Sequence, residues 1–389
     1  MKRFSLYVVD ILLGVSVFVS VAAMIISPRE AAEAARQGIK LCMDVIVPSL
    51  FPFFVLSSLT VELGLTRYLG RALERVMRPV FRVGGACSAA VVMGFIGGYP
   101  VGARTALALY ESGQCTKTEA ERLLSFCNNS GPAFILGAVG AGIFSSSTVG
   151  WLLYLAHTAA SLTVGVLFRF YKYRDDGAHG LKKQNRPAVR VTRAFVTSVR
   201  SSFDAILGVC AFVIFFAVAI RMLYAFGTLT AISDWTGELL RPLGVERGLI
   251  DKLFAGLIEV TSGLWTLQSV SAEVTQKLAM AAFMLGWAGV SVHCQVLTFI
   301  GESNLRTWPY IVGKLLHGVI SAAYMVGLLQ FFHVKIPVSS FLLTQMDDIM
   351  RMDSLGTLSA TLWVSAILLC AAILLAGFGL LRKNYKTDL

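Results

Sequence analysis

Apolar residues fill the chain in runs of about twenty, separated by short polar or charged segments. A helix of that length matches the roughly 30 Å hydrocarbon core of a bilayer. The pattern therefore predicts spanning helices at 6–26, 42–63, 149–170, 203–226, 278–300, 308–332 and 358–381. With one broken helix, described next, we expect an all-α polytopic membrane protein of about eight full spans.

Between residues 84 and 144 the apolar pattern is interrupted twice by residues that a spanning helix tolerates poorly. The breaks are Gly97-Gly98-Tyr99-Pro100-Val101-Gly102 and Asn128-Asn129-Ser130-Gly131-Pro132. The apolar runs at 86–96 and 133–144 would be roughly 16–18 Å long, about half of the hydrocarbon core. Irregular backbone at that depth must be buried in protein or line a wet cavity, because lipid offers no hydrogen bonds. We predict a re-entrant hairpin followed by a broken helix, as in transport sites.

The second half of the chain repeats this order about 160 residues later. Matching segments, given in pairs, are Arg78-Pro79 with Arg241-Pro242, Gly94 to Gly97 with Gly256 to Glu259, Asn129-Ser130-Gly131 with Trp287-Ala288-Gly289, and His157 and Ser161 with His317 and Ser321. The second short apolar segment, 249–270, is interrupted at Glu259-Val260-Thr261-Ser262-Gly263. Each unit would hold a span, an interfacial helix, a re-entrant hairpin, a broken helix and a span. Three crossings are an odd number, so the second unit should insert inverted.

Five segments follow from this organisation. They are an N-terminal transmembrane helix with an amphipathic helix (1–41), a first transport repeat (42–170), a basic cytoplasmic linker (171–202), a second transport repeat (203–332), and an outer loop with a C-terminal transmembrane helix (333–389).

Polar segments next to the spans are predicted to lie on the membrane surface. Residues 28–40 and 234–247 are predicted to lie at the membrane interface. Arginines spaced three or four apart from Arg67 to Arg82 predict a basic amphipathic helix on the cytoplasmic surface, in contact with lipid headgroups. Pro48 and Pro52 should kink the second span.

Composition agrees with a membrane protein. The chain is 56% hydrophobic and 15% charged, with a mean hydropathy of +0.70, which no ordinary soluble domain needs. The net charge of +11 is spread over short segments between apolar runs. This distribution sets orientation, with both termini cytoplasmic, and no nucleic-acid partner is predicted.

No sequence pattern indicates an enzyme, a cofactor or a metal. The seven cysteines are scattered and form no CxxC pair, so we predict neither disulfides nor metal ligands. The chain lacks HExxH, GxGD, Ser-x-x-Lys and Gly-x-Ser-x-Gly motifs, and it lacks a Walker A motif for ATP-driven pumping.

The segments Gly94 to Ala103 and Phe126 to Pro132 resemble the YlbJ-type sporulation integral membrane proteins. These belong to the nucleoside-recognition (Gate) group, which is related to concentrative nucleoside carriers. The resemblance extends over about residues 40–335. It implies a carrier in the bacterial membrane surrounding the forespore, with dipicolinic acid as its substrate. The chain departs from nucleoside carriers at the first hairpin tip, where Tyr99, Pro100 and Arg104 replace amide and carboxylate groups.

The first candidate binding site is the break at Asn128 to Pro132. Pro132 suits the first turn of a half-helix capped by Ser130 or Gly131. The free N–H groups of that turn would face the midplane and favour a carboxylate, with Asn128, Asn129 and Ser130 as further donors. The alternative is a helix kink whose polar side chains satisfy freed carbonyls.

Glu259 is the second candidate, because a carboxylate near the bilayer centre costs about 2–4 kcal/mol. Glu259 would couple transport to protons, pair with a substrate hydroxyl or ring nitrogen, or simply be exposed to water in a shallow hairpin. Thr261 and Ser262 would add hydroxyl ligands.

Four more residues are candidates with a competing interpretation. Arg104 could bind an anionic substrate in a bidentate manner or face the cytoplasm. Tyr99 could stack on a heteroaromatic ring or stabilise the turn. His157 and His317 could relay protons or form a helix-packing hydrogen bond.

These observations favour a secondary transporter of a small anionic aromatic solute that works by alternating access. Coupling to protons or another cation, contact with lipid and a homo-oligomer are compatible with this architecture. The alternatives are a transporter of nucleosides or related solutes, and a sporulation membrane scaffold that transports nothing.

Overall fold

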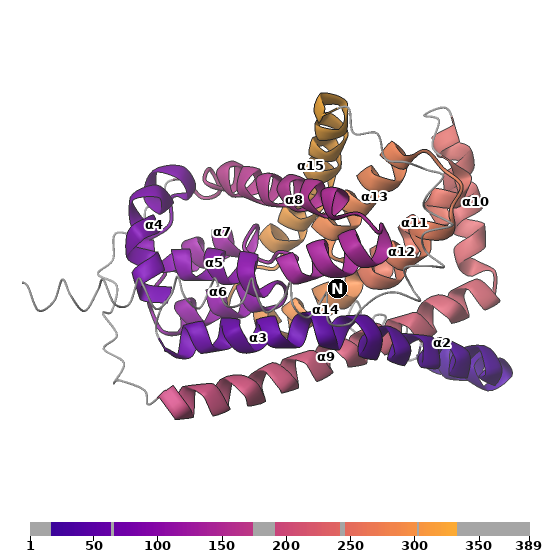
Figure 1. Cartoon of the computed structure of the whole chain (residues 1–389), viewed down its shortest axis with the longest axis horizontal. Helices are drawn as coiled ribbons and strands as arrows, with labels where there is room; N and C mark the ends of the chain where they lie inside the picture. Colours follow the sequence, from indigo (N-terminus) through magenta and orange to yellow (C-terminus); the bar gives the residue numbers. More distant parts are fainter. Residues whose placement is uncertain (1–16, 64–65, 174–190, 242–245, 302, 333–389) are drawn as a thin grey trace, which may run out of the picture.

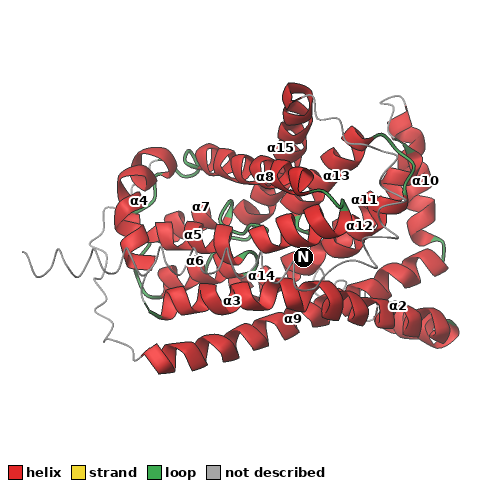
Figure 2. Cartoon of the chain, viewed as in Figure 1, coloured by secondary structure: helices red, strands yellow, loops and turns green. Residues whose placement is uncertain are grey.

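The computed structural model describes residues 17–63, 66–173, 191–241, 246–301 and 303–332. Within these ranges the chain forms helices and loops only (Figure 2). The first predicted span is described from Val17, and residues 17–26 of it are helical. The predicted outer loop and C-terminal helix, 333–389, lie outside the described residues.

Two series of helices follow the same order along the chain. The first contains α3 (Val47–Glu62), α4 (Thr66–Phe81), α5 (Ser88–Gly97), α6 (Val101–Glu111), α7 (Lys117–Leu124), the π-helix η3 (Ala133–Ile143) and α8 (Ser147–Phe168). The second contains α9 (Val191–Ala225), α10 (Thr228–Leu240), α11 (Arg247–Ile258), α12 (Val260–Thr266), α13 (Val274–Trp287), α14 (Gly289–Gly301) and α15 (Trp308–Phe332). Short 3-10 turns, η2 (Gly85–Cys87) and η5 (Leu267–Ser269), connect helices within them. Each series is a long helix, a short helix, a hairpin, a broken helix and a long helix.

Glycines close both hairpins in the same way, which supports the internal duplication. In the first hairpin, a Cβ at Gly102 would come within 2.8 Å of the Gly94 Cα. In the second, a Cβ at Gly263 would collide with the backbone of Gly256. Small residues at these positions let the two arms approach closely. The turn of the first hairpin contains Gly98 at φ +72°, a conformation that favours glycine.

The long helices support a membrane location. Within the described residues, α8, α9, α13–α14 and α15 are long and apolar enough to cross a bilayer, and the bent pair 75–81 and 85–97 could add one more span. Large apolar side chains on α8 and α9 are exposed, among them Trp151, Phe203 and Phe215. Exposed apolar surface on this scale fits contact with lipid. The total of eight spans stays a prediction.

The first helical stretch is longer than the sequence pattern suggests. The predicted interfacial segment is α2 (Pro28–Leu41), and it continues through the π-helix η1 (Cys42–Ile46) into α3. No glycine or proline interrupts the join, and the π-turn lies just before Pro48. Proline has no N–H to donate to the carbonyl one turn earlier, and a widened turn there accommodates the missing hydrogen bond. The α2–α3 stretch runs side by side with α9 (Figure 1).

Helix α9 also begins earlier than the predicted span, inside the range assigned to the linker. Ala194, Ser198 and Ser202 are buried at four-residue spacing, in line with Ile206 and Cys210. This stripe of small residues packs against neighbouring helices and extends α9 toward its N-terminus. Similarly, α10 begins before the predicted interfacial segment and ends at Leu240, and α11 begins at Arg247.

Helix α7 connects several distant segments through buried charges. The Glu121 carboxylate accepts hydrogen bonds of 2.7 Å from Tyr171 Oη and from Lys172 Nζ, and one of 3.1 Å from the Arg306 N–H. Arg122 donates to the carbonyl oxygens of Arg82 and Tyr171. The two series of helices are thus joined at this end, because Arg306 precedes α15.

The hydrogen bonds to Glu121 and its burial have opposite effects on the pKa of its carboxyl. Burial raises the pKa of the Glu121 carboxyl, but the donors on Lys172, Tyr171 and Arg306 outweigh it and hold that pKa below its ordinary value. A carboxyl whose pKa is lowered by folding stabilises the fold above its unfolded pKa of about 4.3, and that contribution disappears as the pH falls through the folded value.

We expect Glu121→Gln to lower the free energy of unfolding by about 2 kcal/mol at neutral pH, because charge-assisted hydrogen bonds are lost. The difference from wild type should shrink as the pH falls below about 4. Thermal unfolding of the detergent-solubilised protein at several pH values measures this, with the exposed Glu111→Gln as a control. An effect of Glu121→Gln that is independent of pH would contradict the assignment.

Tight hairpin packing gives a second expectation. A Cβ added at Gly102 would collide with the Cys127 carbonyl oxygen, whereas one at Gly208 on α9 meets nothing within 4 Å. Gly102→Ala should therefore lower stability by about 2 kcal/mol or more, and Gly208→Ala should be neutral or slightly stabilising because alanine favours helix. Unfolding midpoints of the two purified variants check this, and equal midpoints would contradict it.

Candidate transport site

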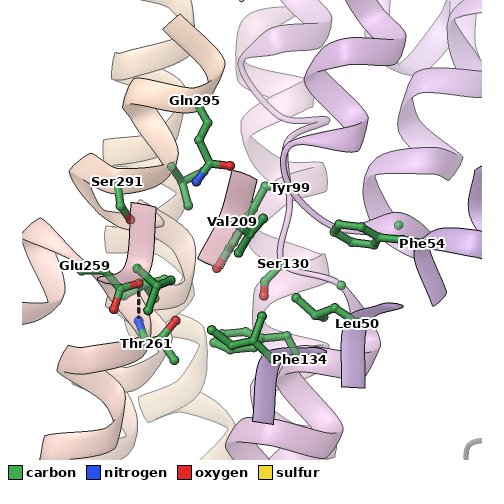
Figure 3. Close-up of a pocket in the computed structure, with 17 residues that line it drawn as sticks. Leu50, Phe54, Tyr99, Ser130, Phe134, Val209, Glu259, Thr261, Ser291 and Gln295 are labelled. Atoms are coloured by element: carbon green, nitrogen blue, oxygen red, sulfur yellow. Dashed lines mark hydrogen bonds between the residues drawn. The ribbon is translucent and has the colours of Figure 1, made fainter. Parts of the chain in front are cut away.

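A narrow cavity of about 40 Å³ lies where the two hairpins approach the two broken helices (Figure 3). The first series contributes residues of its hairpin tip and unwound segment: Gly97, Gly98, Tyr99, Ser130 and Gly131. The second series faces them with residues of its hairpin and of α14: Glu259, Val260, Thr261, Ser291, Val292 and Gln295. The remaining wall is apolar: Ile46, Leu50, Phe54, Phe134, Val209 and Val213. Segments far apart in the sequence thus line one cavity.

The first hairpin turns where the sequence predicts it. Helix α5 ends at Gly97 and α6 begins at Val101, with a cis peptide bond between Tyr99 and Pro100. The half-buried Tyr99 lies on the cavity wall. Arg104 lies one turn into α6, is exposed and is not part of the wall.

The second break is also where the sequence predicts it. Residues 128–131 are non-helical, and the helix resumes at Pro132. The amide oxygens of Asn128 and Asn129 are buried and have no hydrogen-bond partner among the described residues. The Ser130 N–H, expected to be free for a ligand, instead donates to His157 Nε2 at 3.0 Å. This segment is held by protein on one side and lines the cavity at Ser130 and Gly131.

The break in the second hairpin is narrower than predicted. Only Glu259 is extended, and α12 resumes at Val260. The reason is local, because the Glu259 carboxylate caps α12 by accepting from the N–H groups of Thr261 at 3.0 Å and Ser262 at 2.6 Å. Glu259 is 1% exposed. The cavity therefore contains a buried carboxylate that two backbone donors hold in place.

The helix that follows is bent as well, at Ala288 and Gly289, which have φ values of +76° and +81°. The Trp287 indole N–H donates to the Leu257 carbonyl at 3.1 Å and ties this bend to the second hairpin. Beyond the bend, Ser291 and Gln295 face the cavity from successive turns of α14 (Figure 3).

His157 and His317 meet where α8 packs on α15. Their ring centroids are 4.3 Å apart, and His317 Nε2 donates to the His157 carbonyl at 2.9 Å. They are 160 positions apart, as the repeat predicts, and contact between equivalent residues is typical of a two-fold relation. His157 Nε2 accepts from Ser130, so its proton must be on Nδ1. The His157 ring is therefore neutral, and His317 Nδ1 faces the donor Nζ of Lys314 at 3.5 Å, as in a neutral ring with its proton on Nε2.

Sequence reasoning missed Lys314, which lies one turn before His317 on α15. Its side chain is fully buried, and its Nζ donates to the Asn128 carbonyl at 3.0 Å and lies 3.5 Å from His317 Nδ1. A lysine in an apolar span is a signal in itself, and the i, i+3 spacing to His317 places both on one face. Ser291 and Gln295 were missed because isolated polar residues in a span carry no motif.

The predicted site residues thus fall into three groups. Tyr99, Ser130, Glu259 and Thr261 line the cavity. Asn128, Asn129, Ser262 and His157 are not part of the wall but lie within two residues of it or bond to it. Arg104 and His317 are not brought to the cavity, although His317 contacts His157 behind it.

Known proteins resemble this chain in sequence. A family model described as "Gate: Nucleoside recognition" matches residues 44–168. The chain is 33% identical over 339 residues to the sporulation integral membrane protein YlbJ of Bacillus subtilis (strain 168), covering 82% of each chain. The chain belongs to the YlbJ family of sporulation integral membrane proteins.

Two solved structures of CNTnw are similar in shape. The inward-facing, substrate-bound state has a TM-score of 0.46 at 13% identity, covering 82% of this chain and 87% of that one. An outward-facing variant has a TM-score of 0.45 at 14% identity, with the same coverage. With the helical hairpins and candidate spans described above, the family membership makes this an integral membrane protein.

The bond between Ser130 and His157 predicts a selective effect of substitution. His157→Leu leaves the buried Ser130 N–H without an acceptor, which costs about 1–3 kcal/mol. His157→Gln can still accept through its amide oxygen, so its loss should be smaller. Thermal unfolding of both variants in detergent measures the difference. Equal loss in the two would mean that ring packing, and not this hydrogen bond, matters at the position.

Proposed function

We propose that this protein is a secondary transporter of a small anionic aromatic solute, dipicolinic acid, during endospore formation. The observation that carries the proposal is that both hairpins and both broken helices line the same cavity. Such discontinuous helices meeting between repeats are the construction of secondary transporters. The sporulation role is taken from the B. subtilis relative, whose name states it. As part of this proposal, the protein lies in the membrane around the forespore, with the cytoplasmic termini that its charge distribution predicts.

The lining suits a flat solute with polar edges. Apolar side chains such as Leu50, Phe54 and Phe134 form one part of the wall and can pack against a ring. Polar groups line the other part: Tyr99, Ser130, Glu259, Thr261, Ser291 and Gln295 (Figure 3). An apolar pocket with a few placed polar groups is the usual design of a small-molecule site.

Glu259 determines how an anion could enter. A buried carboxylate repels a carboxylate solute unless one of the two carries a proton. We propose that a proton enters with the solute and is shared between Glu259 and a carboxyl or ring nitrogen of the solute. The anion would then cross with a proton, which lowers the net charge that must be buried.

The cavity volume implies that the helices must move. About 40 Å³ holds only a few water molecules, and an aromatic dicarboxylic acid needs more room. Binding would therefore widen the boundary between the two series, as alternating access requires.

A nucleoside or related solute is the second candidate. It is favoured by the nucleoside-recognition family model, which covers the first hairpin and the unwound segment. Glu259, Ser291 and Gln295 could bind sugar hydroxyls or base edges by hydrogen bonds.

The proposal is tested with purified protein in lipid vesicles, by uptake of labelled dipicolinate and labelled nucleosides with and without proton and sodium gradients. We expect dipicolinate uptake driven by an inward proton gradient. Glu259→Gln and Asn129→Ala should each reduce uptake at least about tenfold, equivalent to 1.4 kcal/mol. Glu273→Gln is the matched control, because Glu273 precedes α13 without capping it and is exposed.

Each alternative has its own outcome. Uptake of nucleosides alone would replace the substrate. Uptake of neither solute, with both variants supporting sporulation as well as wild type does, would favour the scaffold.

A further inference from the structure

Lys314 is buried between the two series of helices, away from the surface charges. It is 0% exposed, and its Nζ contacts are the Asn128 carbonyl oxygen at 3.0 Å and His317 Nδ1 at 3.5 Å. Asn128 begins the unwound segment that reaches the cavity two residues later, at Ser130. The lysine therefore lies directly behind the part of the cavity wall that has no regular secondary structure.

The groups around Lys314 are basic or neutral. His317 lies on the same helix, His157 on α8, and His293 on α14 with its Nδ1 2.9 Å from Tyr310 Oη. The hydrogen bonds of His157 and His317 are those of neutral rings, as described above. No carboxylate of the described residues forms an ion pair with Lys314.

A buried ammonium group without a counter-ion is costly, and such residues in membrane proteins are usually paired or functional. The other buried charge of this region, Glu259, is in the cavity and is held by the N–H groups of α12. Thus a basic side chain lies behind the Ser130 segment of the wall. The Glu259 carboxylate lines the opposite side of the cavity, facing Ser130 (Figure 3). This polarity suits a solute with a negative end and a hydrogen-bond-donating end.

Unpartnered acceptors make the intervening segment able to adjust. The amide oxygens of Asn128 and Asn129 are buried without partners among the described residues. Their amide N–H groups donate to Tyr310 Oη at 3.5 Å and to the Phe126 carbonyl at 2.9 Å, so rotation of either side chain would exchange one of these bonds for a bond to an anion. The lysine would then balance the charge of the anion without touching it.

We propose that Lys314 is the counter-charge that makes the site select anions. Lys314 is a positioning residue that does not touch the solute. Its charge acts through the Asn128 peptide group and the unwound segment, and it makes the site prefer a carboxylate solute over a neutral solute of the same shape. This inference rests on the proposed transport function.

The test compares two solutes of the same shape, dipicolinate and the neutral pyridine-2,6-dicarboxamide, in vesicles that contain the full chain. Lys314→Gln deletes the charge. His317→Glu neutralises it differently, by placing a carboxylate where His317 Nδ1 now contacts the lysine. Both variants should lose at least about tenfold of the ratio of dipicolinate to dicarboxamide uptake and retain dicarboxamide uptake. Lys252→Gln is the matched control, because Lys252 is a half-buried lysine of α11 that lies over the Tyr224 ring. This variant should keep the wild-type ratio.

The two variants keep the test decisive. If Lys314→Gln does not fold, as shown by its elution and unfolding profile, the ratio in His317→Glu decides, since that variant gains an ion pair. A wild-type ratio in either folded variant overturns the counter-charge role, as does a change in both solutes by the same factor. Absence of dipicolinate uptake by wild type is a different result, because it rejects the proposed function itself.

Discussion

The structure depends on one constraint, which is that backbone groups freed by a broken helix in a membrane must find partners inside the protein. Residues 128–131 meet this constraint through side chains from distant helices. His157 accepts the Ser130 N–H, and Lys314 donates to the Asn128 carbonyl. The Phe126 carbonyl, at the start of the break, accepts from Ser161 and Asn129. The breaks are therefore stable because both series of helices supply partners.

The same constraint explains why polar residues gather at the boundary between the series. On α8 and α15, His157, Ser161, Lys314, His317 and Ser321 are all fully buried. Apolar faces of the same helices point outward. Polar side chains that satisfy the breaks must face inward, since lipid cannot solvate them. The site and the internal duplication are two consequences of one packing arrangement.

Much of this could be predicted from the sequence. Gly98, Pro100 and Pro132 disrupt helices by their own backbone properties, so the breaks near them were located correctly. Glu259 was predicted to open a wider break, because its capping of α12 depends on a side-chain conformation that no local pattern specifies. The extension of α9 to Val191 depends on packing of Ala194 and Ser198 against other helices. Lys314 is a single charge in an apolar run, and only the fold reveals what surrounds it.

The glycines of the first hairpin restrict how the cavity can widen. Gly94 and Gly102 both lie against the Cys127 carbonyl oxygen, with no room for even a methyl group. Sliding the hairpin along the unwound segment would drive one backbone into the other. These two parts must consequently travel as one rigid body. The gap has to open on the opposite side of the cavity, where the side chains of Glu259, Ser291 and Gln295 line the wall.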